Sequence, residues 1–214
     1  MKEFQRQFID FAIDIGAIRF GEFTLKSGRI SPYFFNAGLF NTGNTLARLG
    51  EFYAEAIIDA GLEFNMLYGP AYKGIPLVAT VAIALATRHD HDYPYAFNRK
   101  EVKDHAEGGI IVGSPIQGRV LIIDDVVSAG LSANEAVDII RAQGGEPCGM
   151  AIAVDRQERG EGNKAAVQEI EDRHGFGVTS IVKLETLIPY LKDNDGLSHH
   201  LAAMEAYRQK FGAY

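Results

Sequence analysis

The stretch that decides the fold reads Val120-Leu121-Ile122-Ile123-Asp124-Asp125-Val126-Val127-Ser128-Ala129-Gly130-Leu131-Ser132. Its apolar first part predicts a buried strand, and the helical spacing of 132–143 predicts a helix directly afterwards. Two adjacent carboxylates, followed by small and hydroxyl residues, join the two elements. A strand, a short loop and a helix in this order are typical of an α/β protein with a parallel sheet.

Outside this stretch, most of the chain repeats the alternation of strands and helices. We expect strands at 65–69, 93–97, 119–123, 147–154 and 178–183, with helices at 74–88, 132–143 and 164–174 between them. We also expect helices at 2–15, 42–60, 184–191 and 197–211, and a pair of strands at 20–25 and 30–36. Right-handed crossovers then place helices on both faces of a mostly parallel sheet. The uncharged stretch 74–87 is too short to span a membrane and predicts a buried helix.

Length and composition predict one globular domain. The 214 residues are 47% hydrophobic and 23% charged, which is ordinary for a folded protein. The single Cys148 excludes an internal disulfide framework and fits a reducing compartment. A net charge of −7 argues against broad binding of nucleic acids or anionic membranes, although a local basic pocket stays open. The N-terminal residues are amphipathic rather than signal-like, so we expect a cytoplasmic protein.

The loop after the strand that ends at Ile123 predicts a phosphate site. Backbone N–H groups at a helix N-terminus bind phosphate oxygens, and Gly130 permits their close approach. The carboxylates of Asp124 and Asp125 would repel a bare phosphate, but they suit a ligand that also carries hydroxyl donors, as a ribose does. The loop lacks the Gly-Lys-Ser/Thr of a P-loop and the glycine spacing of a dinucleotide site. The simpler alternative is that the carboxylates only cap the helix.

Two further segments carry charge where ligands bind in such sheets. Gly69 to Lys73 follows a strand and opens a helix, and Lys73 opposes the helix dipole, which suggests a nearby anion. Residues 97–109 are dense in charge of both signs and predict an exposed loop that acts as a lid over a polyanion. The basic side chains of this lid are Arg99, Lys100, Lys103 and His105. For both segments, a solvated surface is the alternative.

Two segments suit a planar, acidic base. Phe34 and Phe35 follow a Lys-Ser-Gly turn and offer an aromatic wall, but neighbouring residues of a strand face opposite sides, so one of them belongs to the core. Residues 155–160 follow another strand and place Arg156 where it can meet an anionic group.

The loop with two aspartates resembles the phosphoribosyl-diphosphate signature of type I phosphoribosyltransferases. Ser128 stands where that family usually has Thr, so the hydroxyl is retained. The turn at Lys26, the string 97–109 and the pair Asp155-Arg156 resemble the branch of the family that uses orotate. The resemblance covers nearly the whole chain.

The resemblance implies a single domain over 1–214 with the type I phosphoribosyltransferase fold. Its core would comprise about 62–184, and a small hood would comprise about 1–40 with C-terminal parts. The implied reaction transfers ribose 5-phosphate from phosphoribosyl diphosphate to orotate, which gives orotidine monophosphate in pyrimidine biosynthesis. The resemblance also implies Mg²⁺ carried by the substrate, reached by Asp124 and Asp125 through water, and a homodimer whose subunits share lid residues.

The resemblance further implies roles for particular residues. Those expected to contact phosphoribosyl diphosphate are Lys26, Tyr72, Lys73, Arg99, Lys100, Lys103, His105, Asp124, Asp125, Val126, Val127, Ser128, Ala129, Gly130, Leu131 and Ser132. Those expected to contact orotate are Phe34, Phe35, Ser128 and Arg156. Those expected to take part in catalysis are Lys26, Lys73, Lys103, His105, Asp124 and Asp125.

Three other functions remain as alternatives. A phosphoribosyltransferase for a purine base would share the phosphate loop but would have no use for Arg156. A non-catalytic regulator with the same fold would need a basic surface or an added DNA-binding motif, and neither is evident in the sequence. A generic nucleotide-binding protein is weakened by the missing Gly-Lys-Ser/Thr. We expect no nucleic-acid or membrane partner.

Overall fold

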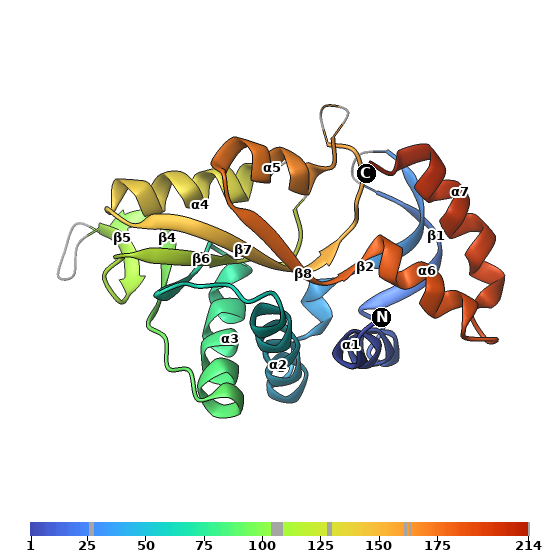
Figure 1. Cartoon of the computed structure of the whole chain (residues 1–214), viewed down its shortest axis with the longest axis horizontal. Helices are drawn as coiled ribbons and strands as arrows, with labels where there is room; N and C mark the ends of the chain where they lie inside the picture. Colours follow the sequence, from blue (N-terminus) through green and yellow to red (C-terminus); the bar gives the residue numbers. More distant parts are fainter. Residues whose placement is uncertain (26–27, 104–108, 128–129, 161, 163, 214) are drawn as a thin grey trace.

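A computed structural model describes residues 1–25, 28–103, 109–127, 130–160, 162 and 164–213 of the chain (Figure 1). The N-terminal elements are α1 (Glu3–Asp14), β1 (Ile18–Thr24), β2 (Ile30–Phe35), η1 (Ala37–Leu39) and α2 (Gly43–Asp59). The middle of the chain forms β3 (Met66–Gly69), α3 (Gly74–His89), β4 (Tyr95–Lys103), β5 (Gly109–Gly113), β6 (Arg119–Ile123) and α4 (Leu131–Ala142). The remainder forms β7 (Glu146–Asp155), α5 (Ala166–His174), β8 (Gly177–Lys183), α6 (Leu184–Lys192), η2 (Ser198–His200) and α7 (Leu201–Phe211).

The predicted α/β fold with a mostly parallel sheet is confirmed. Six strands run in the order β5-β4-β3-β6-β7-β8, and only β5 is antiparallel to its neighbour. Helices α2 and α3 lie on one face of this sheet, and α4 and α5 lie on the other (Figure 1). The carboxyl ends of β3, β6 and β7 therefore meet at one edge of the sheet, where ligands bind in this architecture.

Strand β6 is apolar throughout its buried part because both of its faces are covered. Val120 and Ile122 belong to the core between the sheet and the α4–α5 layer, whereas Leu121 and Ile123 belong to the core on the α2–α3 side. All four side chains are at most 1% exposed. A strand buried on both faces reads as a continuous hydrophobic run, which is why this stretch predicts the fold so clearly.

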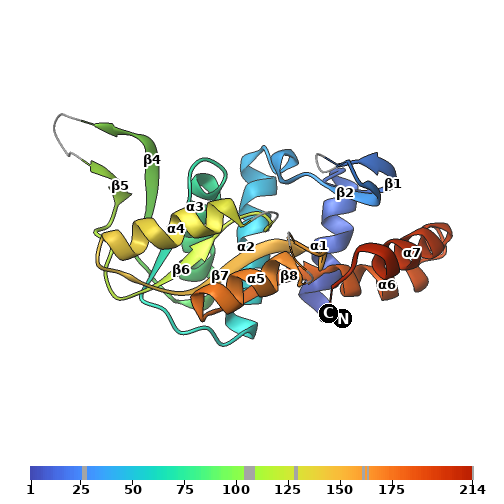
Figure 2. The same ribbon diagram turned by 90° about the horizontal axis from the view of Figure 1, so that it is seen from above.

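Elements from both ends of the chain gather at one end of the molecule. Strands β1 and β2 pair as an antiparallel hairpin, and α1, α6 and α7 lie beside it (Figures 1 and 2). We call this the hood end, since it holds the residues from which the resemblance predicts a hood. Phe35 packs against Phe8 and Phe40 in the core, whereas Phe34 stacks on Phe23. The prediction that one of the two adjacent phenylalanines belongs to the core is thus confirmed.

The prediction of an exposed loop from 97 to 109 is wrong over much of its length. Strand β4 continues to Lys103, and the unpredicted strand β5 pairs with it. Asn98, inside this segment, is only 3% exposed. The segment can carry many charged residues because it forms a hairpin at the edge of the sheet. Its backbone pairs with the apolar strand at 109–113, so its charged side chains need not be buried. Residues 104–108 lie outside the part of the chain that the structure describes.

Two helix predictions also need correction. Helix α3 is not buried on all sides, because Ile83 is 63% exposed. The helix expected from Leu197 begins at Leu201 and is preceded by the short 3-10 turn of η2. Among the described residues, no helix is both long and apolar enough to cross a membrane.

A substitution at Gly50 tests how closely α2 and α3 pack. A Cβ atom at this position would lie 2.6 Å from the carbonyl oxygen of Thr80, which is backbone and cannot move aside. We expect Gly50→Ala to lower the free energy of unfolding by about 1–3 kcal/mol through overpacking. Urea denaturation measures this change. Gly43→Ala is the matched control, because a Cβ there meets nothing within 4 Å, and it should be neutral or stabilising.

Candidate active site

Three loops that are far apart in the sequence lie together at the carboxyl edge of the sheet. They follow β3, β6 and β7, which are neighbours in the sheet. The hairpin of the hood end reaches the last of these loops, because Nη2 of Arg156 donates to Oγ of Ser31 over 3.2 Å. The fold therefore brings the predicted phosphate loop, the Lys73 loop and the Arg156 loop together on one side of the molecule.

The acidic pair after β6 is buried and held in place by hydrogen bonds. Asp124 and Asp125 are 6% and 7% exposed. Oδ1 of Asp124 accepts from the backbone N–H of Asp125 over 2.9 Å, and its Oδ2 accepts from the Ser132 hydroxyl over 2.9 Å. Oδ1 of Asp125 accepts from the N–H of Val126 over 3.0 Å. Both carboxylates are thereby oriented before any ligand arrives.

Burial disfavours the charged form of the Asp124 carboxylate. Desolvation and the neighbouring charge of Asp125 raise its pKa to about 6, against the hydrogen bonds from the Asp125 backbone and from Ser132, which lower it. Tyr53 fixes the same turn from the α2 side, since its hydroxyl donates to the carbonyl oxygen of Asp124 over 2.6 Å. A ligand that donates hydrogen bonds to this carboxylate would stabilise its charged form.

Lys73 supplies the cation for this acidic pair. It stands at the N-cap of α3, and its Nζ lies 2.5 Å from Oδ2 of Asp125. The anion expected beside Lys73 is therefore present within the chain itself. The Lys73 side chain is 66% exposed whereas that of Asp125 is 10% exposed, so the lysine can reach solvent or a ligand while the aspartate stays in the protein.

Gly130 lets α4 begin where it does. Its φ is +70°, in the left-handed region, and a Cβ there would lie 2.9 Å from Cδ1 of Ile170 on α5. Both the backbone conformation and the close approach of α5 therefore favour glycine. The first turn of α4 leaves backbone N–H groups free for an anion, and Leu131 in this turn is 77% exposed. Ser128 and Ala129 lie outside the described residues.

The basic side chains predicted for the lid are placed only in part. Lys100 lies with its Nζ 5.9 Å from the Tyr72 ring and 4.0 Å from Glu135 of α4. Nη1 of Arg99 is buried and has no hydrogen-bond partner among the described residues. For Lys103 the structure describes the backbone alone. Lys26 and His105 lie in the segments outside the description.

Polar and aromatic side chains surround the Arg156 guanidinium at the hood end. It pairs with Glu158 at 2.6 Å and lies 4.5 Å above the centre of the Tyr33 ring. Burial lowers its pKa, but the neighbouring Tyr33 hydroxyl, the charge of Glu158 and the hydrogen bond to Glu158 raise it more. Of the two phenylalanines expected near the base, Phe35 faces the core, and the structure gives Phe34 a ring contact with Phe23.

Sequence reasoning missed four polar residues that support these loops. They are Ser31, Asn98, Glu158 and Tyr207. Asn98 accepts from the backbone N–H of Ala71 over 2.8 Å and so ties the loop after β3 to β4. The opposite charges of Arg156 and Glu158, two positions apart, were a signal for an ion pair. No local signal marks Tyr207, which meets Glu158 from 49 residues away.

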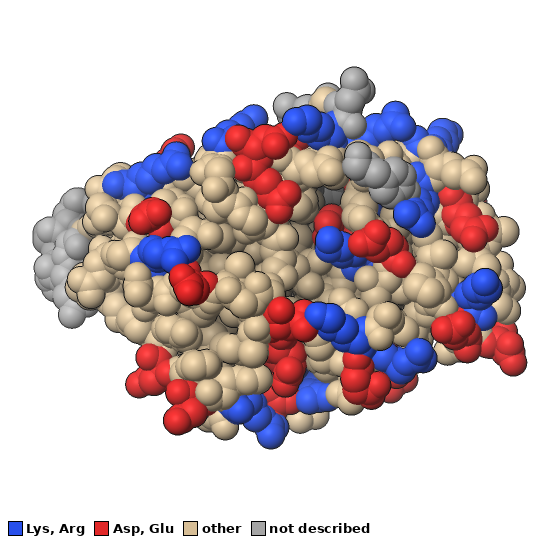
Figure 3. All heavy atoms as spheres, in the orientation of Figure 1, with Lys and Arg blue, Asp and Glu red and all other residues tan. Residues whose placement is uncertain are grey.

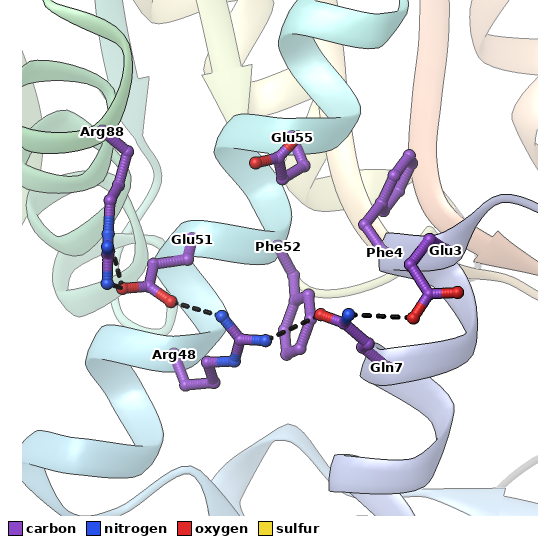
Figure 4. Close-up of a pocket in the computed structure, with 8 residues that line it drawn as sticks. All are labelled: Glu3, Phe4, Gln7, Arg48, Glu51, Phe52, Glu55 and Arg88. Atoms are coloured by element: carbon purple, nitrogen blue, oxygen red, sulfur yellow. Dashed lines mark hydrogen bonds and ion pairs between the residues drawn. The ribbon is translucent and has the colours of Figure 1, made fainter.

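A cleft of about 400 Å³ lies away from this edge, between α1, α2 and α3 (Figure 4). Apart from Glu55, its charged groups already bind other groups of the cleft. Glu51 accepts from both Arg48 and Arg88, Arg48 donates to Gln7, and Gln7 donates to Glu3 (Figure 4). This network joins three helices, and its polar groups have no need of a ligand.

Charge is not segregated on the face of the molecule shown in Figure 3, where acidic and basic side chains are interspersed. An anionic ligand is therefore attracted by the local groups of the loops rather than by a broad basic surface.

The chain is similar to known proteins over nearly its whole length. The family model for the phosphoribosyl transferase domain matches residues 39–180. The orotate phosphoribosyltransferase of Photobacterium profundum is 57% identical over 99% of this chain and all of that protein, and the one of Thioalkalivibrio sulfidiphilus is 60% identical with the same coverage. A crystal structure of the orotate phosphoribosyltransferase of Francisella tularensis is 41% identical, with a TM-score of 0.88 over 97% of this chain and all of that one.

Replacing Asp124 by Asn tests whether the acidic pair is held at a cost to stability. The folded-state pKa of about 6 exceeds the ordinary value of 3.8, so the charged carboxylate destabilises the fold above both values, and this effect disappears below the lower one. We expect Asp124→Asn to raise the free energy of unfolding at pH 7.5 by roughly 1–3 kcal/mol, since the Asn oxygen can accept from the N–H of Asp125 and its amide group can donate to the Ser132 hydroxyl. Thermal and urea unfolding measure it.

The pH dependence separates this cause from a general effect of substitution. The gain should shrink steadily between pH 7.5 and pH 4, as the wild-type carboxylate becomes neutral. Asp172→Asn is the control, because its side chain is 57% exposed and its ion pair with Lys164 lies at the surface. A destabilised Asp124→Asn protein at pH 7.5 would contradict the argument.

Proposed function

The chain belongs to the orotate phosphoribosyltransferases of the phosphoribosyltransferase family, and on this premise we propose how the residues at the sheet edge divide the reaction between them. The protein transfers ribose 5-phosphate from phosphoribosyl diphosphate to orotate in pyrimidine biosynthesis. The observation that carries the proposed division is the buried acidic pair beside the N-terminus of α4. A phosphate site and two hydroxyl acceptors, side by side, match a ribose 5-phosphate.

The reaction exchanges one bond at the anomeric carbon of the ribose. A bond forms from a ring nitrogen of orotate to this carbon, and the bond from the carbon to the diphosphate oxygen breaks. The electron pair of the broken bond leaves with diphosphate, so positive charge develops on the ribose ring and negative charge on the leaving group. The protein must hold the ribose, receive the diphosphate charge and place orotate opposite the leaving group.

We assign the ribose and its 5-phosphate to the loop after β6. Asp124 and Asp125 accept hydrogen bonds from the ribose hydroxyls, and the N–H groups of the first turn of α4, beside Gly130, hold the phosphate. A helix terminus contributes at most about 2 kcal/mol to binding an anion. Micromolar affinity requires about 8 kcal/mol. Several N–H donors and the lysines must therefore act together with the helix dipole.

We assign the diphosphate to Lys73 and the basic residues of β4. Lys73 is exposed and already forms an ion pair with Asp125. When the ribose hydroxyls bind that carboxylate, Lys73 can leave it and bind a diphosphate oxygen instead. Tyr72 lies in the same loop as Lys73, and Arg99 and Lys100 lie on the neighbouring strand β4. Lys26, Lys103 and His105 are proposed to complete this set, as the resemblance implies.

We assign the base to Arg156 and the hairpin of the hood end. Arg156 carries a permanent positive charge, and orotate, unlike the neutral pyrimidines, brings a carboxylate. Phe34 and Phe35 end strand β2 of this hairpin, and of the two Phe35 packs into the core. Ser128 belongs to the adjacent phosphate loop. The ring nitrogen of orotate loses its proton as the new bond forms. The leaving diphosphate can take up this proton, so the reaction needs no strong general base from the protein.

The proposed Mg²⁺ fits a role as part of the substrate. Among the described residues, no three His, Cys, Asp or Glu side chains gather as metal ligands, and Asp125 is paired with Lys73. Mg²⁺ prefers oxygen ligands and keeps several waters, which phosphate groups allow. Asp124 and Asp125 would meet it through water, and the ion would neutralise charge on the leaving diphosphate. We propose the cytoplasm as the compartment.

The shape of β4 supports a homodimer whose lids are shared. Strand β3 ends level with Phe97 of β4, but β4 runs on to Lys103. At roughly 3.3 Å per residue, the backbone of Lys103 can stand up to about 20 Å beyond that level. Figures 1 and 2 show β4 and β5 at the end of the molecule opposite the hood end. A lid placed there is better situated to close over a neighbouring subunit.

An uncharged face of α3 supplies a surface for the second subunit. Pro76 is exposed and Ile83 is 63% exposed, and the two lie seven positions apart on α3. Tyr72, in the loop just before the helix, is 70% exposed. This face continues from the Lys73 loop, so a second copy seated on it would lie next to the diphosphate residues. We propose that this face belongs to the dimer interface.

Turnover of orotate tests the base assignment. We expect the purified protein to consume orotate in the presence of phosphoribosyl diphosphate and Mg²⁺, with one diphosphate released per orotate, followed by absorbance. Uracil and adenine should react at less than about a hundredth of that rate, because neither offers a carboxylate to Arg156. Arg156→Ala should raise KM for orotate at least tenfold. Equal turnover of the three bases would contradict the assignment.

Subunit complementation tests the shared lid. Lys103→Ala and the double variant Asp124→Asn/Asp125→Asn should each be nearly inactive as homodimers. When the two are coexpressed, half of the dimers are mixed, and each mixed dimer has one complete site if the lid comes from the neighbour. We expect recovery of about one quarter of the wild-type activity. If each lid serves its own subunit, mixed dimers have no complete site, and activity should not recover.

A further inference from the structure

A half-buried glutamate connects Arg156 to the C-terminal helix. Oε1 of Glu158 accepts from Nε of Arg156 over 2.8 Å and from the hydroxyl of Tyr207 over 2.8 Å. Its other oxygen, Oε2, lies 3.5 Å from Nη1 of Arg29 on the hood hairpin. The Glu158 side chain is only 14% exposed. Three segments that are far apart in the sequence thus meet at one carboxylate.

The backbone around Glu158 is clamped by the C-terminal residues. Gln157, between the arginine and the glutamate, has a left-handed φ of +49°, a conformation that a non-glycine residue keeps only when its surroundings hold it. Its N–H donates to Asp155 over 2.8 Å, and its carbonyl oxygen accepts from the N–H of Ala213 over 3.0 Å. The N–H of Arg159 also donates to the carbonyl of Phe211 over 3.0 Å. The turn is therefore fixed from both sides.

The contacts of Arg156 leave one end of its guanidinium open. Nε and Nη2 bind Glu158, and Nη2 also donates to Ser31. The ring of Tyr33 covers one face of the group. Nη1 makes no hydrogen bond to any residue within the described part of the chain. A planar group held on one edge and one face presents its remaining donors in a fixed direction.

We propose that Glu158, steadied by Tyr207, is a positioning residue that aims Nη1 of Arg156 at the carboxylate of the acidic base. Preference for an acidic base is then set partly by the C-terminal helix α7, which carries Tyr207. The inference rests on the proposed function of Arg156. A long flexible side chain that is already ordered loses less conformational freedom when it binds its ligand.

The negative charge of Glu158 allows positioning to be distinguished from simple electrostatic attraction. The two explanations predict opposite effects on orotate binding when Glu158 is removed. A negative charge beside Arg156 weakens its attraction for an anion at long range. If attraction alone determined orotate binding, removal of Glu158 would strengthen binding. If orientation determines it, removal weakens binding.

Steady-state kinetics of three variants test the proposal. We expect Glu158→Ala to raise KM for orotate at least tenfold, with KM for phosphoribosyl diphosphate changed less than twofold and kcat less than threefold. Glu158→Gln keeps an acceptor oxygen and should raise KM for orotate less than Glu158→Ala does. Tyr207→Phe removes one hydroxyl and should raise it about threefold. Glu185→Ala is the control, since Glu185 is near the same turn but 48% exposed, and it should change neither KM more than twofold.

A double-mutant cycle separates positioning from a general loss of structure. In the Arg156→Ala background, Glu158→Ala should change kcat/KM for orotate less than twofold, because no guanidinium remains to be aimed. A merely structural glutamate would cost the same in both backgrounds. Should Glu158→Ala fail to fold, Tyr207→Phe supplies the same comparison.

Two outcomes overturn the inference, and neither is the outcome that overturns the proposed function. The first is a wild-type enzyme that uses orotate while Glu158→Ala and Tyr207→Phe leave its KM unchanged or lower it. The second is additive losses in the double-mutant cycle. Absence of orotate turnover by the wild-type protein would instead reject the proposed function itself.

Discussion

The repulsion between two adjacent buried carboxylates at the end of β6 is the constraint around which the rest of the site is arranged. Asp124 and Asp125 are nearly inaccessible, and burial with mutual repulsion raises the pKa of Asp124 to about 6. The surrounding groups offset this cost in part. Backbone N–H groups and Ser132 donate to the carboxylates, and Lys73 approaches from the loop after the neighbouring strand. The pKa of Asp124 nevertheless stays raised, which favours a ligand whose hydroxyl groups donate hydrogen bonds to the carboxylates.

The parallel sheet is what makes this compensation possible. The strands β3, β6 and β7 end at the same edge, so a cation from one loop reaches an anion from the next without any long-range attraction. The same geometry places the N-terminus of α4 beside the carboxylates. In the proposed division, the phosphate held by that helix and the hydroxyls held by the carboxylates belong to one ligand, which would explain why like charges are retained in a site for an anion.

The two ends of the molecule serve different parts of the proposed reaction. The hood end contributes Arg156, held by Glu158, Ser31 and Tyr33, and so offers a fixed cation to an acidic base. Strands β4 and β5 lie at the opposite end of the molecule (Figure 2). One end is ordered in advance by buried contacts, whereas the other is proposed to act on a second subunit. This division accounts for the ion pair that holds Arg156 at one end and for the charged hairpin of β4 and β5 at the other.

The sequence by itself determined the elements that are buried on both faces and the loop chemistry that follows them. The run from Val120 to Asp125 predicts strand β6 and its acidic pair, because continuous apolar residues followed by carboxylates have few other structures available. Tertiary structure alone decided the rest. Strand β5 escaped prediction because it has only five residues and its partner β4 is rich in charge, and Tyr207 escaped because its partner Glu158 lies 49 residues away. Local pattern reports burial and turns, whereas contacts between distant segments exist only once the chain has folded.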